Sequence, residues 1–491
     1  SFNLFNHSNK PASYWIQKIH AGNNNTILAG TTNQGLKIFN TVTHQYEDVL
    51  TYNPDKTAIF VRNILQYSPG EYWIGTETGI FIYQTDSKTF TNLRKKYQDP
   101  YSLNDNAIYA LFKDKEGSIW AGTFFGGVNY YAKENAAFRK YFPGNNENPI
   151  QGNAVREICK DEFGNLWVGT EDGGLNKISA GTGALTNFKP TGKKNSIAYT
   201  NIHGLFADGN DLWIGTFEHG IDLMDIRSGK IIRHFAAGRG KNDIKSNFAL
   251  CFYKTKAGYI YIGTANGVYL YNRKAGNFSS LPKIPKNIFV TGLLEDHHNI
   301  IWASTNNDGV FWYDPADGHS GHLLKEDHNA NSISNNSVND IFEDSQNNIW
   351  FSTEGGGLCS LNDKRNKFTL FTTKNGLPAN FIFKVLEDDS HRLWASTSRG
   401  LVNFGQGFNN PVIYTQANGL LNNQFNYHSG YKDKDGRLYF GSVKGMVSFM
   451  PGEIQKSKII PPVYFTGMQI FNHDLPVLRR QQGTLSQLHT L

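Results

Sequence analysis

One five-residue phrase recurs along the chain, and it constrains the fold more than any other feature. In its typical form it reads Leu or Ile, an aromatic residue, a small or β-branched residue, Gly or Ser, and Thr, as in LWVGT ending at Thr170. Its ten copies end at Thr31, Thr76, Thr123, Thr170, Thr216, Thr264, Thr305, Thr353, Thr397 and Ser442, so neighbours lie 41 to 48 residues apart. Seven of the nine Trp residues occupy the aromatic position: Trp73, Trp120, Trp167, Trp213, Trp302, Trp350 and Trp394. Self-similarity at this period indicates a repeat architecture.

Each copy stands in the same surroundings. An apolar-alternating run that ends in Asp or a substitute precedes it, as in AVREICKD ending at Asp161, and a turn that often contains Gly follows that run. After the Thr come a second turn ending in Gly, an apolar strand and a weaker fourth strand. Four short strands per unit are typical of a propeller blade. We therefore predict an all-β protein, a tandem β-propeller of about ten four-stranded blades. The aromatic residue would fill the wedge between blades, and the Thr and Asp would bond turn backbone.

The composition excludes several other classes of protein. Aromatic residues make up 14% and charged residues 18% of the chain, which excludes a disordered segment. Three Cys in 491 residues cannot form a disulfide scaffold, and the 49 Gly lack the three-residue period of collagen. No apolar run approaches the roughly 18 residues that a membrane-spanning helix needs. The net charge of +6 permits an acidic partner without requiring one.

The repeat resembles a known family. Residues 161–175, DEFGNLWVGTEDGGL, are similar to the consensus of the two-component regulator propeller repeat. That repeat builds the periplasmic sensor region of hybrid two-component systems in Bacteroides-like bacteria. The last copy, with Gly445 and Phe449-Met450-Pro451, is similar to the family's last blade. The segment from Ile459 to Asn472 resembles the first strand of the tyrosine-repeat immunoglobulin-like domain that follows the propellers in that family.

The family implies two consecutive seven-bladed propellers, and ten copies depart from that number. Seven copies counted back from Ser442 end at the copy with Thr170, and the segment Phe138 to Phe142 could supply the fourth strand that the last blade lacks. We therefore predict the C-terminal blades of an incomplete first propeller in 1–136 and a seven-bladed propeller in 137–457. A truncated start of the immunoglobulin-like domain is predicted in 458–491. A single ten-bladed ring is the alternative.

The sequence holds little sign of catalysis. In sialidase-type Asp boxes the Asp lies two residues before Gly and five before Trp, whereas here Asp161 lies three before Gly164 and six before Trp167. The repeated Asp is therefore interpreted as a turn residue. A tandem-propeller glycosidase or lyase would need a pair of cleft carboxylates, and none stands out from its repeat position. No metalloprotease, nucleophile-elbow or P-loop spacing occurs.

Metal and thiol chemistry is equally unsupported. His297-His298 and the DKDG segment at Asp433 lie where other copies have turns. Cys159, Cys251 and Cys359 fall in strands of different blades and are expected to be small buried residues. We expect no catalytic residue, no cofactor and no metal site in this chain.

A binding face is the better-supported prediction. The turn after each Thr varies between copies, and aromatic, carboxylate and amide side chains on one rim suit a sugar. The candidate ligand-binding residues in these turns are Phe124, Phe125, Glu171, Phe217, Glu218, His219, Asn306, Glu354 and Arg399. Each could equally be a solvated turn residue. Basic clusters in the connections between blades, such as Arg94-Lys95-Lys96, could attract an acidic glycan or only keep the surface soluble.

The family resemblance sets the functional expectation. It implies the periplasmic part of an inner-membrane hybrid histidine kinase that binds an oligosaccharide and signals to polysaccharide-utilisation genes, and an acidic oligosaccharide is one candidate ligand. The fragment itself would be no enzyme, and the full-length protein would be a homodimer that crosses the membrane through a helix absent from this chain. Nucleic-acid binding is not expected, because no motif supports it. A glycoside hydrolase or lyase and a protein-interaction propeller remain the alternatives.

Overall fold

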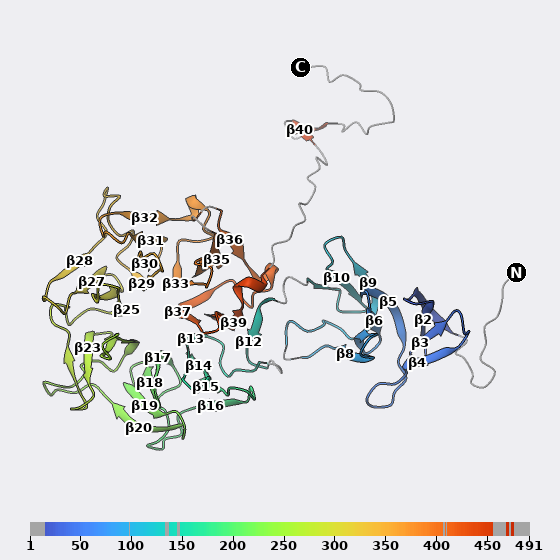
Figure 1. Ribbon diagram of the computed structural model, residues 1–491, viewed down its shortest axis with the longest axis horizontal. Coiled ribbons are helices and arrows are strands. Elements are labelled where there is room, and N and C mark those ends of the chain that lie inside the picture. Colours follow the sequence, from blue (N-terminus) through green and yellow to red (C-terminus); the bar gives the residue numbers. More distant parts are fainter. Residues whose placement is uncertain are drawn as a thin grey trace. The chain divides into compact units, whose positions relative to one another are not determined.

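The computed structural model describes residues 15–97, 99–132, 137–144, 148–405, 408, 410–454 and the short strands at 468–470 and 473–475. The chain forms two compact units, Ser1–Ile454 and Gln455–Leu491, and each is treated by itself. The first unit consists almost wholly of antiparallel sheets, which confirms the all-β prediction (Figure 1). Within the described residues, nine sheets have four strands and one has three.

The strands fall into four sets by their order within each sheet. First strands are β1 (Ile16–Ala21), β5 (Val61–Ser68), β9 (Ile108–Lys113), β13 (Val155–Lys160), β17 (Ile202–Asp208), β21 (Ala249–Lys254), β25 (Val290–Glu295), β29 (Val338–Glu343), β33 (Ile382–Glu387) and β37 (Phe425–Lys432). Second strands, which carry the repeated phrase, are β2 (Thr26–Thr31), β6 (Glu71–Thr76), β10 (Ile119–Thr123), β14 (Leu166–Thr170), β18 (Asp211–Thr216), β22 (Ile260–Thr264), β26 (Ile301–Thr305), β30 (Ile349–Thr353), β34 (Leu393–Thr397) and β38 (Leu438–Ser442).

The outer strands complete the sheets. Third strands are β3 (Leu36–Asn40), β7 (Gly79–Gln84), β11 (Val128–Tyr131), β15 (Leu175–Ile178), β19 (Ile221–Asp225), β23 (Gly267–Asn272), β27 (Val310–Tyr313), β31 (Leu358–Leu361), β35 (Gly400–Phe404) and β39 (Gly445–Phe449). Fourth strands are β4 (Tyr46–Leu50), β8 (Thr89–Leu93), β12 (Arg139–Tyr141), β16 (Leu185–Phe188), β20 (Lys230–Phe235), β24 (Asn277–Ser280), β28 (Ser320–Leu323), β32 (Phe368–Phe371) and β36 (Val412–Tyr414). Short 3₁₀ helices are η2 (Thr373–Asn375), η4 (Gln416–Asn418) and η5 (Pro451–Glu453).

The last sheet takes its fourth strand from an earlier part of the chain. Strand β12 pairs antiparallel with β39, with Arg139 opposite Ser448 and Tyr141 opposite Met446. This pairing confirms that the segment around Phe138 to Phe142 supplies the missing strand. We call the seven sheets from β12 to β39 the C-terminal propeller. In Figure 1 its sheets are arranged in a circle with the first strands toward the centre, and β37 of the seventh sheet contacts β13 of the first.

The core lies between neighbouring sheets rather than inside any one of them. Trp167, for example, packs in one cluster with Leu212 and Ile214 of the next sheet, and Trp350 packs with Leu393 and Ala395. Six of the seven repeat tryptophans are buried in this way. Sheets with apolar residues on both faces need such a neighbour on each side, because burial of apolar area is the main stabilising term.

Trp120 is the exception to the predicted wedge packing. It is 41% exposed, and its sheet (β9–β11) has three strands in the described residues. Other aromatic and apolar side chains of the same sheet, such as Phe112 and Val128, are also exposed. The packing prediction is therefore wrong for Trp120, because no described sheet covers that face.

Two side chains of the repeat hold its turns. The motif Thr or Ser donates its hydroxyl to the carbonyl of the Gly that ends the second turn in all ten copies, as in Thr305 to Gly309 at 2.7 Å. The repeated Asp accepts turn amides and the indole N–H six residues later, as in Asp161 with Trp167 at 2.8 Å. These contacts confirm the predicted structural roles of the Thr and the Asp.

The second unit is described only in part. Strands β40 (Met468–Ile470) and β41 (His473–Leu475) pair antiparallel. The predicted start of an immunoglobulin-like domain otherwise lies outside the described residues, and the predicted domain limits stay predictions.

Candidate functional site

The first strands of the C-terminal propeller share a backbone irregularity. In six of them the register with the second strand shifts after the first residue, as between Val155 and Glu157 or between Val338 and Asp340. Such a β-bulge leaves one residue without a cross-strand partner and turns its side chain in a new direction. The residues at the six bulges are Arg156, His203, Leu250, Thr291, Asn339 and Phe383.

These bulges surround a cavity of about 260 Å³ at the centre of the propeller. Five of the six bulge residues line it, and Phe289, Asn306, Glu354, Tyr427 and His428 complete the lining. The bulges lie where the first strands begin, so the cavity opens at the end of the propeller that carries the turns after the motif Thr. We call it the central cavity.

The seventh sheet contributes the largest irregularity. Phe425 pairs with Ser442, but the next pair in register is Gly430 with Phe440, so several residues of β37 bulge from the sheet. Within this bulge His428 has a φ of 56°, a left-handed conformation that costs free energy in a non-glycine residue. The strained bulge brings Tyr427 and His428 into the cavity lining.

A buried charge network lies beneath the lining. His428 Nδ1 is 3.2 Å from Glu157 and its Nε2 is 3.2 Å from Asp340, while Lys384 pairs with Asp340 at 2.9 Å. Burial and the Lys384 charge act to lower the pKa of His428, but the two carboxylates outweigh them and the net shift is upward. Burial raises the pKa of Glu157. The imidazolium form of His428 therefore fits this network, since a buried charge needs a partner.

The mouth of the cavity combines a cation, carboxylates and an aromatic ring. The Arg156 guanidinium lies 5.2 Å from the ring centre of Tyr427 and 3.5 Å from Glu171. The Tyr427 hydroxyl is 3.3 Å from Glu354. Donor and acceptor groups are therefore both present at the opening, and hydroxyl-rich ligands need both.

His203, on the sheet next to that of Arg156, gives one wall of the cavity an apolar character. Its ring lies 4.8 Å from that of Phe248 and 5.7 Å from that of Phe217. Burial and the Arg156 charge lower the pKa of His203 to about 3, so the imidazole is neutral at physiological pH. A neutral imidazole packed against these two rings adds an apolar face to the wall, and its Nδ1 is buried without a hydrogen-bond partner among the described residues.

The structure brings four of the nine predicted binding residues to this cavity. Asn306 and Glu354 line it, Glu171 lies beside Arg156, and Phe217 packs against His203. The other five lie elsewhere. Glu218, His219 and Arg399 are exposed turn residues, and the His219 ring stacks on Tyr199 at 4.0 Å. Phe124 and Phe125 belong to the sheet β9–β11, outside the C-terminal propeller, and Phe125 is 87% exposed.

Sequence reasoning missed the bulge residues because it looked only at the turns. A signal was present: the two positions after the first apolar residue of each first strand read Arg-Glu, His-Gly, Leu-Cys, Thr-Gly, Asn-Asp and Phe-Lys in six copies. These residues differ between copies, although the strand pattern around them is regular. Polar and charged residues in an apolar strand point to a site, since burying them without a partner is costly.

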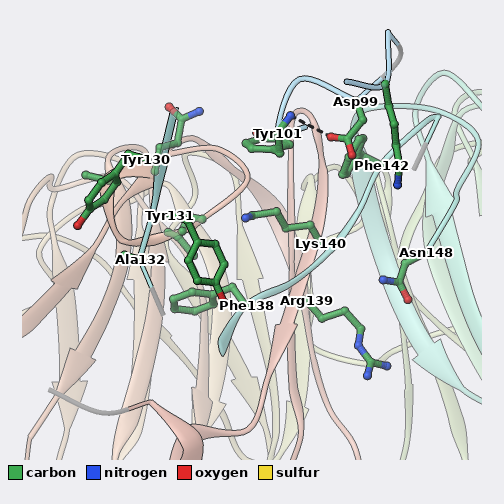
Figure 2. A pocket seen from close by; sticks show the side chains of 15 residues that line it. Asp99, Tyr101, Tyr130, Tyr131, Ala132, Phe138, Arg139, Lys140, Phe142 and Asn148 are labelled. Atoms are coloured by element: carbon green, nitrogen blue, oxygen red, sulfur yellow. Dashed lines mark hydrogen bonds between the residues drawn. The ribbon is translucent and has the colours of Figure 1, made fainter. Parts of the chain in front are cut away.

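A second, larger pocket lies beside β11 and β12 (Figure 2). Its volume is about 620 Å³, and its lining includes Tyr101, Tyr130, Tyr131, Phe138 and Phe142 together with Lys96, Asp99, Arg139 and Lys140. The Tyr101 hydroxyl donates to the Leu421 carbonyl at 2.6 Å, and the Lys140 ammonium lies 4.9 Å from the Tyr101 ring centre. Burial lowers the pKa of Lys140. We call this the tyrosine pocket.

Other reactive groups lie outside both cavities. The three cysteines are buried and unpaired, and burial raises the pKa of all three thiols. Ligand atoms of His297, His298 and Asp363 lie within 4.8 Å of one another, so these residues could hold a metal ion. Within the described residues, no helix is long and apolar enough to cross a membrane.

Comparison with known proteins agrees with this architecture. The family model of the two component regulator propeller matches residues 102–125, 149–172 and 332–355. Histidine kinase P4 of Formosa agariphila is 26% identical over 334 residues, which are 56% of this chain and 24% of that protein.

Solved structures show the same fold. The extracellular domain of the hybrid two component system BT3049 from B. thetaiotaomicron is 25% identical, with a TM-score of 0.74 over 94% of this chain and 61% of that chain. The extracellular domain of BT4673 from the same organism is 18% identical, with a TM-score of 0.53 over 96% of this chain and 63% of that chain, and shares the fold alone. The chain thus spans less than two thirds of the length of each of these proteins. Three segments of the chain match the two-component regulator propeller repeat, and the chain as a whole is similar to the extracellular domain of a hybrid two-component system.

Proposed function

We propose that this chain is the ligand-sensing part of a hybrid two-component histidine kinase, that it lies in the periplasm, and that it binds an oligosaccharide in the central cavity. The observation that supports this most is the convergence of bulge residues and turn residues on one opening. Arg156, Asn306 and Glu354 come from different sheets, and each offers a polar group to the same space.

The chemistry of the lining suits a sugar better than an apolar ligand. Amide, carboxylate and guanidinium groups can satisfy hydroxyls in pairs, while Tyr427 and Phe289 offer ring faces to the apolar side of a pyranose. The volume of about 260 Å³ is slightly below the roughly 300–1,000 Å³ typical of small-molecule sites. We therefore expect one end of the oligosaccharide to enter the cavity and the rest to extend over the rim.

The charge of the site favours a neutral sugar or one with few charges. The carboxylates of Glu171 and Glu354 stand against the Arg156 guanidinium and the His428 imidazolium. That imidazolium is already paired with Glu157 and Asp340. The tyrosine pocket has the opposite balance, with Lys96, Arg139 and Lys140 against Asp99. An acidic glycan would therefore select the tyrosine pocket, which is the second candidate location for the ligand.

The test is titration calorimetry of the chain with neutral and uronic-acid oligosaccharides. Binding in the central cavity predicts that Glu354→Gln and Asn306→Ala each weaken binding at least tenfold, whereas Tyr131→Ala in the tyrosine pocket has no effect. His219→Ala on the exposed rim is the matched control and should also bind normally. The reverse pattern would move the site to the tyrosine pocket, and no binding by any glycan would favour a protein-interaction propeller.

The same samples test the enzymatic alternative. Incubation with the oligosaccharide that binds should leave its chain length unchanged when the products are separated by chromatography. Shortened products would overturn the sensor proposal in favour of a glycoside hydrolase or lyase. In the full-length homodimer, ligand binding would favour one arrangement of the two subunits over another and so reach the kinase across the inner membrane.

A further inference from the structure

Two turns of neighbouring sheets bring three metal-ligating side chains together. His297 and His298 lie in the turn between β25 and β26, and Asp363 lies in the turn between β31 and β32 of the next sheet. The ligand atoms of these three residues lie within 4.8 Å of one another. Because the first strands begin at the central cavity and end at these turns, the cluster lies at the opposite end of the propeller from that cavity.

Asp296 stabilises the turn that carries the two histidines. This buried carboxylate accepts the backbone N–H of His298 at 2.9 Å and that of Ile300 at 3.0 Å. It also forms an ion pair with Arg365, which belongs to the same turn as Asp363. The ion pair between Asp296 and Arg365 therefore connects the two turns without using any of the three candidate ligands. The backbone that carries these ligands is thus already positioned before an ion binds.

Both ring nitrogens of His297 face carboxylate oxygens. Its Nδ1 lies 2.6 Å from Glu343 Oε1, and its Nε2 lies 3.2 Å from Asp363 Oδ1. A neutral imidazole has one N–H and one lone pair. If the N–H donates to Glu343, the lone pair of Nε2 points at a carboxylate oxygen of Asp363. A cation bound between them removes that repulsion, and a carboxylate on the second nitrogen is the partner that metal-bound histidines commonly have.

The neighbouring copies show which part of this arrangement is specific. The backbone N–H of Lys256 donates to Glu295, and that of Ser345 donates to Glu387, just as that of His297 donates to Glu343. The carboxylate on the next sheet is therefore a feature of the repeat. In the copy with Ser345 the imidazole of His391 also lies 3.4 Å from Glu387. Among the three copies, only the one with His297 adds a second imidazole and a carboxylate, which form a group of three candidate ligands in the described residues.

We propose that His297 Nε2, His298 and Asp363 bind a Zn²⁺ ion that links two neighbouring sheets, with Glu343 as the positioning residue of His297. Two imidazole nitrogens and one carboxylate oxygen are a ligand set that suits Zn²⁺ and other late first-row divalent ions rather than Mg²⁺ or Ca²⁺. His298 and Asp363 are exposed, so the ion can load from solvent and water can complete its coordination. This site goes beyond the proposed glycan binding and does not depend on it.

Titration calorimetry of the untagged, chelator-treated chain with ZnCl₂ tests the proposal. We expect one Zn²⁺ per chain, a rise in the thermal unfolding midpoint on loading, and no competition from excess Mg²⁺. His298→Ala and Asp363→Asn should each remove binding. Glu343→Gln should weaken it by about 10- to 100-fold, because it only orients His297. His319→Ala is the matched control, since His319 also pairs with an Asp, Asp317, at 2.7 Å but is not part of the three-ligand group.

A spectroscopic measurement separates this site from adventitious binding. Loading with Co²⁺ should give a visible d–d absorption band that disappears in His298→Ala and persists in His319→Ala. Zn²⁺ binding with the same affinity in His298→Ala, Asp363→Asn and the unaltered chain would overturn the proposal. So would the absence of any Zn²⁺ binding.

Discussion

The indole N–H of Trp350 donates to the Asp344 carboxylate at 2.7 Å within the buried layer between two sheets. The two residues are the aromatic and acidic positions of the repeat, six residues apart. The same carboxylate accepts the backbone N–H groups of Gln346 and Asn348. One side chain thus fixes both the turn and the ring that fills the wedge, which explains why the two residue types recur together.

Asp344→Ala should therefore destabilise the propeller strongly. It leaves two turn amides and a buried indole N–H without their acceptor, and each unsatisfied buried group costs about 1–3 kcal/mol. We expect a loss of about 3 kcal/mol in the free energy of unfolding, measured by urea denaturation. Asp435→Ala, at an exposed position of the corresponding turn in the last sheet, is the control. Equal effects of the two substitutions would contradict this role of the Asp.

The sequence was sufficient to predict the sheets but not the site. The repeated phrase located the second strand of each sheet. Its aromatic residue fills the space between neighbouring sheets, and its Gly and Thr at fixed spacing are needed for the turn that follows. The cavity depends instead on bulges such as that at Arg156 and on the larger one at His428. A bulge changes the direction of one side chain without changing the apolar pattern around it, so the periodicity of the strand does not reveal it. Likewise, the spacing could not show that Trp120 would have no neighbouring sheet.

The turn between β21 and β22 gives a test of backbone conformation alone. Gly258 has a φ of +87°, and a Cβ added there would meet nothing within 4 Å. Gly258→Ala should therefore cost about 1–2 kcal/mol of stability through the left-handed conformation and not through a clash. Gly452→Ala is the matched control, because its surroundings are equally open and its φ is not in the left-handed range. Comparable denaturation midpoints for the two variants would contradict the expectation.

The three cysteines should not react with thiol reagents while the chain is folded. Cys159, Cys251 and Cys359 are all buried, and burial raises the pKa of Cys359 to about 12. Since the thiolate is the reactive form, a thiol reagent should find no reactive group at neutral pH under native conditions and three in denaturant. The readout is the absorbance of the released chromophore. Rapid native labelling of any of the three would show that its strand opens or that the packing around it differs.

His203 should make the propeller sensitive to acid. Burial and the Arg156 charge lower its pKa to about 3 in the folded state, whereas the unfolded chain has the ordinary histidine value of about 6.5. As the pH falls below 6.5 the unfolded chain therefore binds a proton that the folded chain does not, and stability falls with pH. Linkage therefore predicts that this histidine lowers the free energy of unfolding by about 2 kcal/mol between pH 7 and pH 5.

Replacing the imidazole isolates that contribution. Between pH 7 and pH 5, the free energy of unfolding of His203→Gln should fall by about 2 kcal/mol less than that of the unaltered chain. Urea denaturation at each pH measures both values. His219→Gln is the control, because His219 is exposed at the rim and stacks on Tyr199. If His203→Gln and the unaltered chain lose stability in parallel, His203 is either solvated or protonated in the folded state. The wall of the central cavity would then carry a charge below about pH 6.5, and acidic ligands would be favoured there.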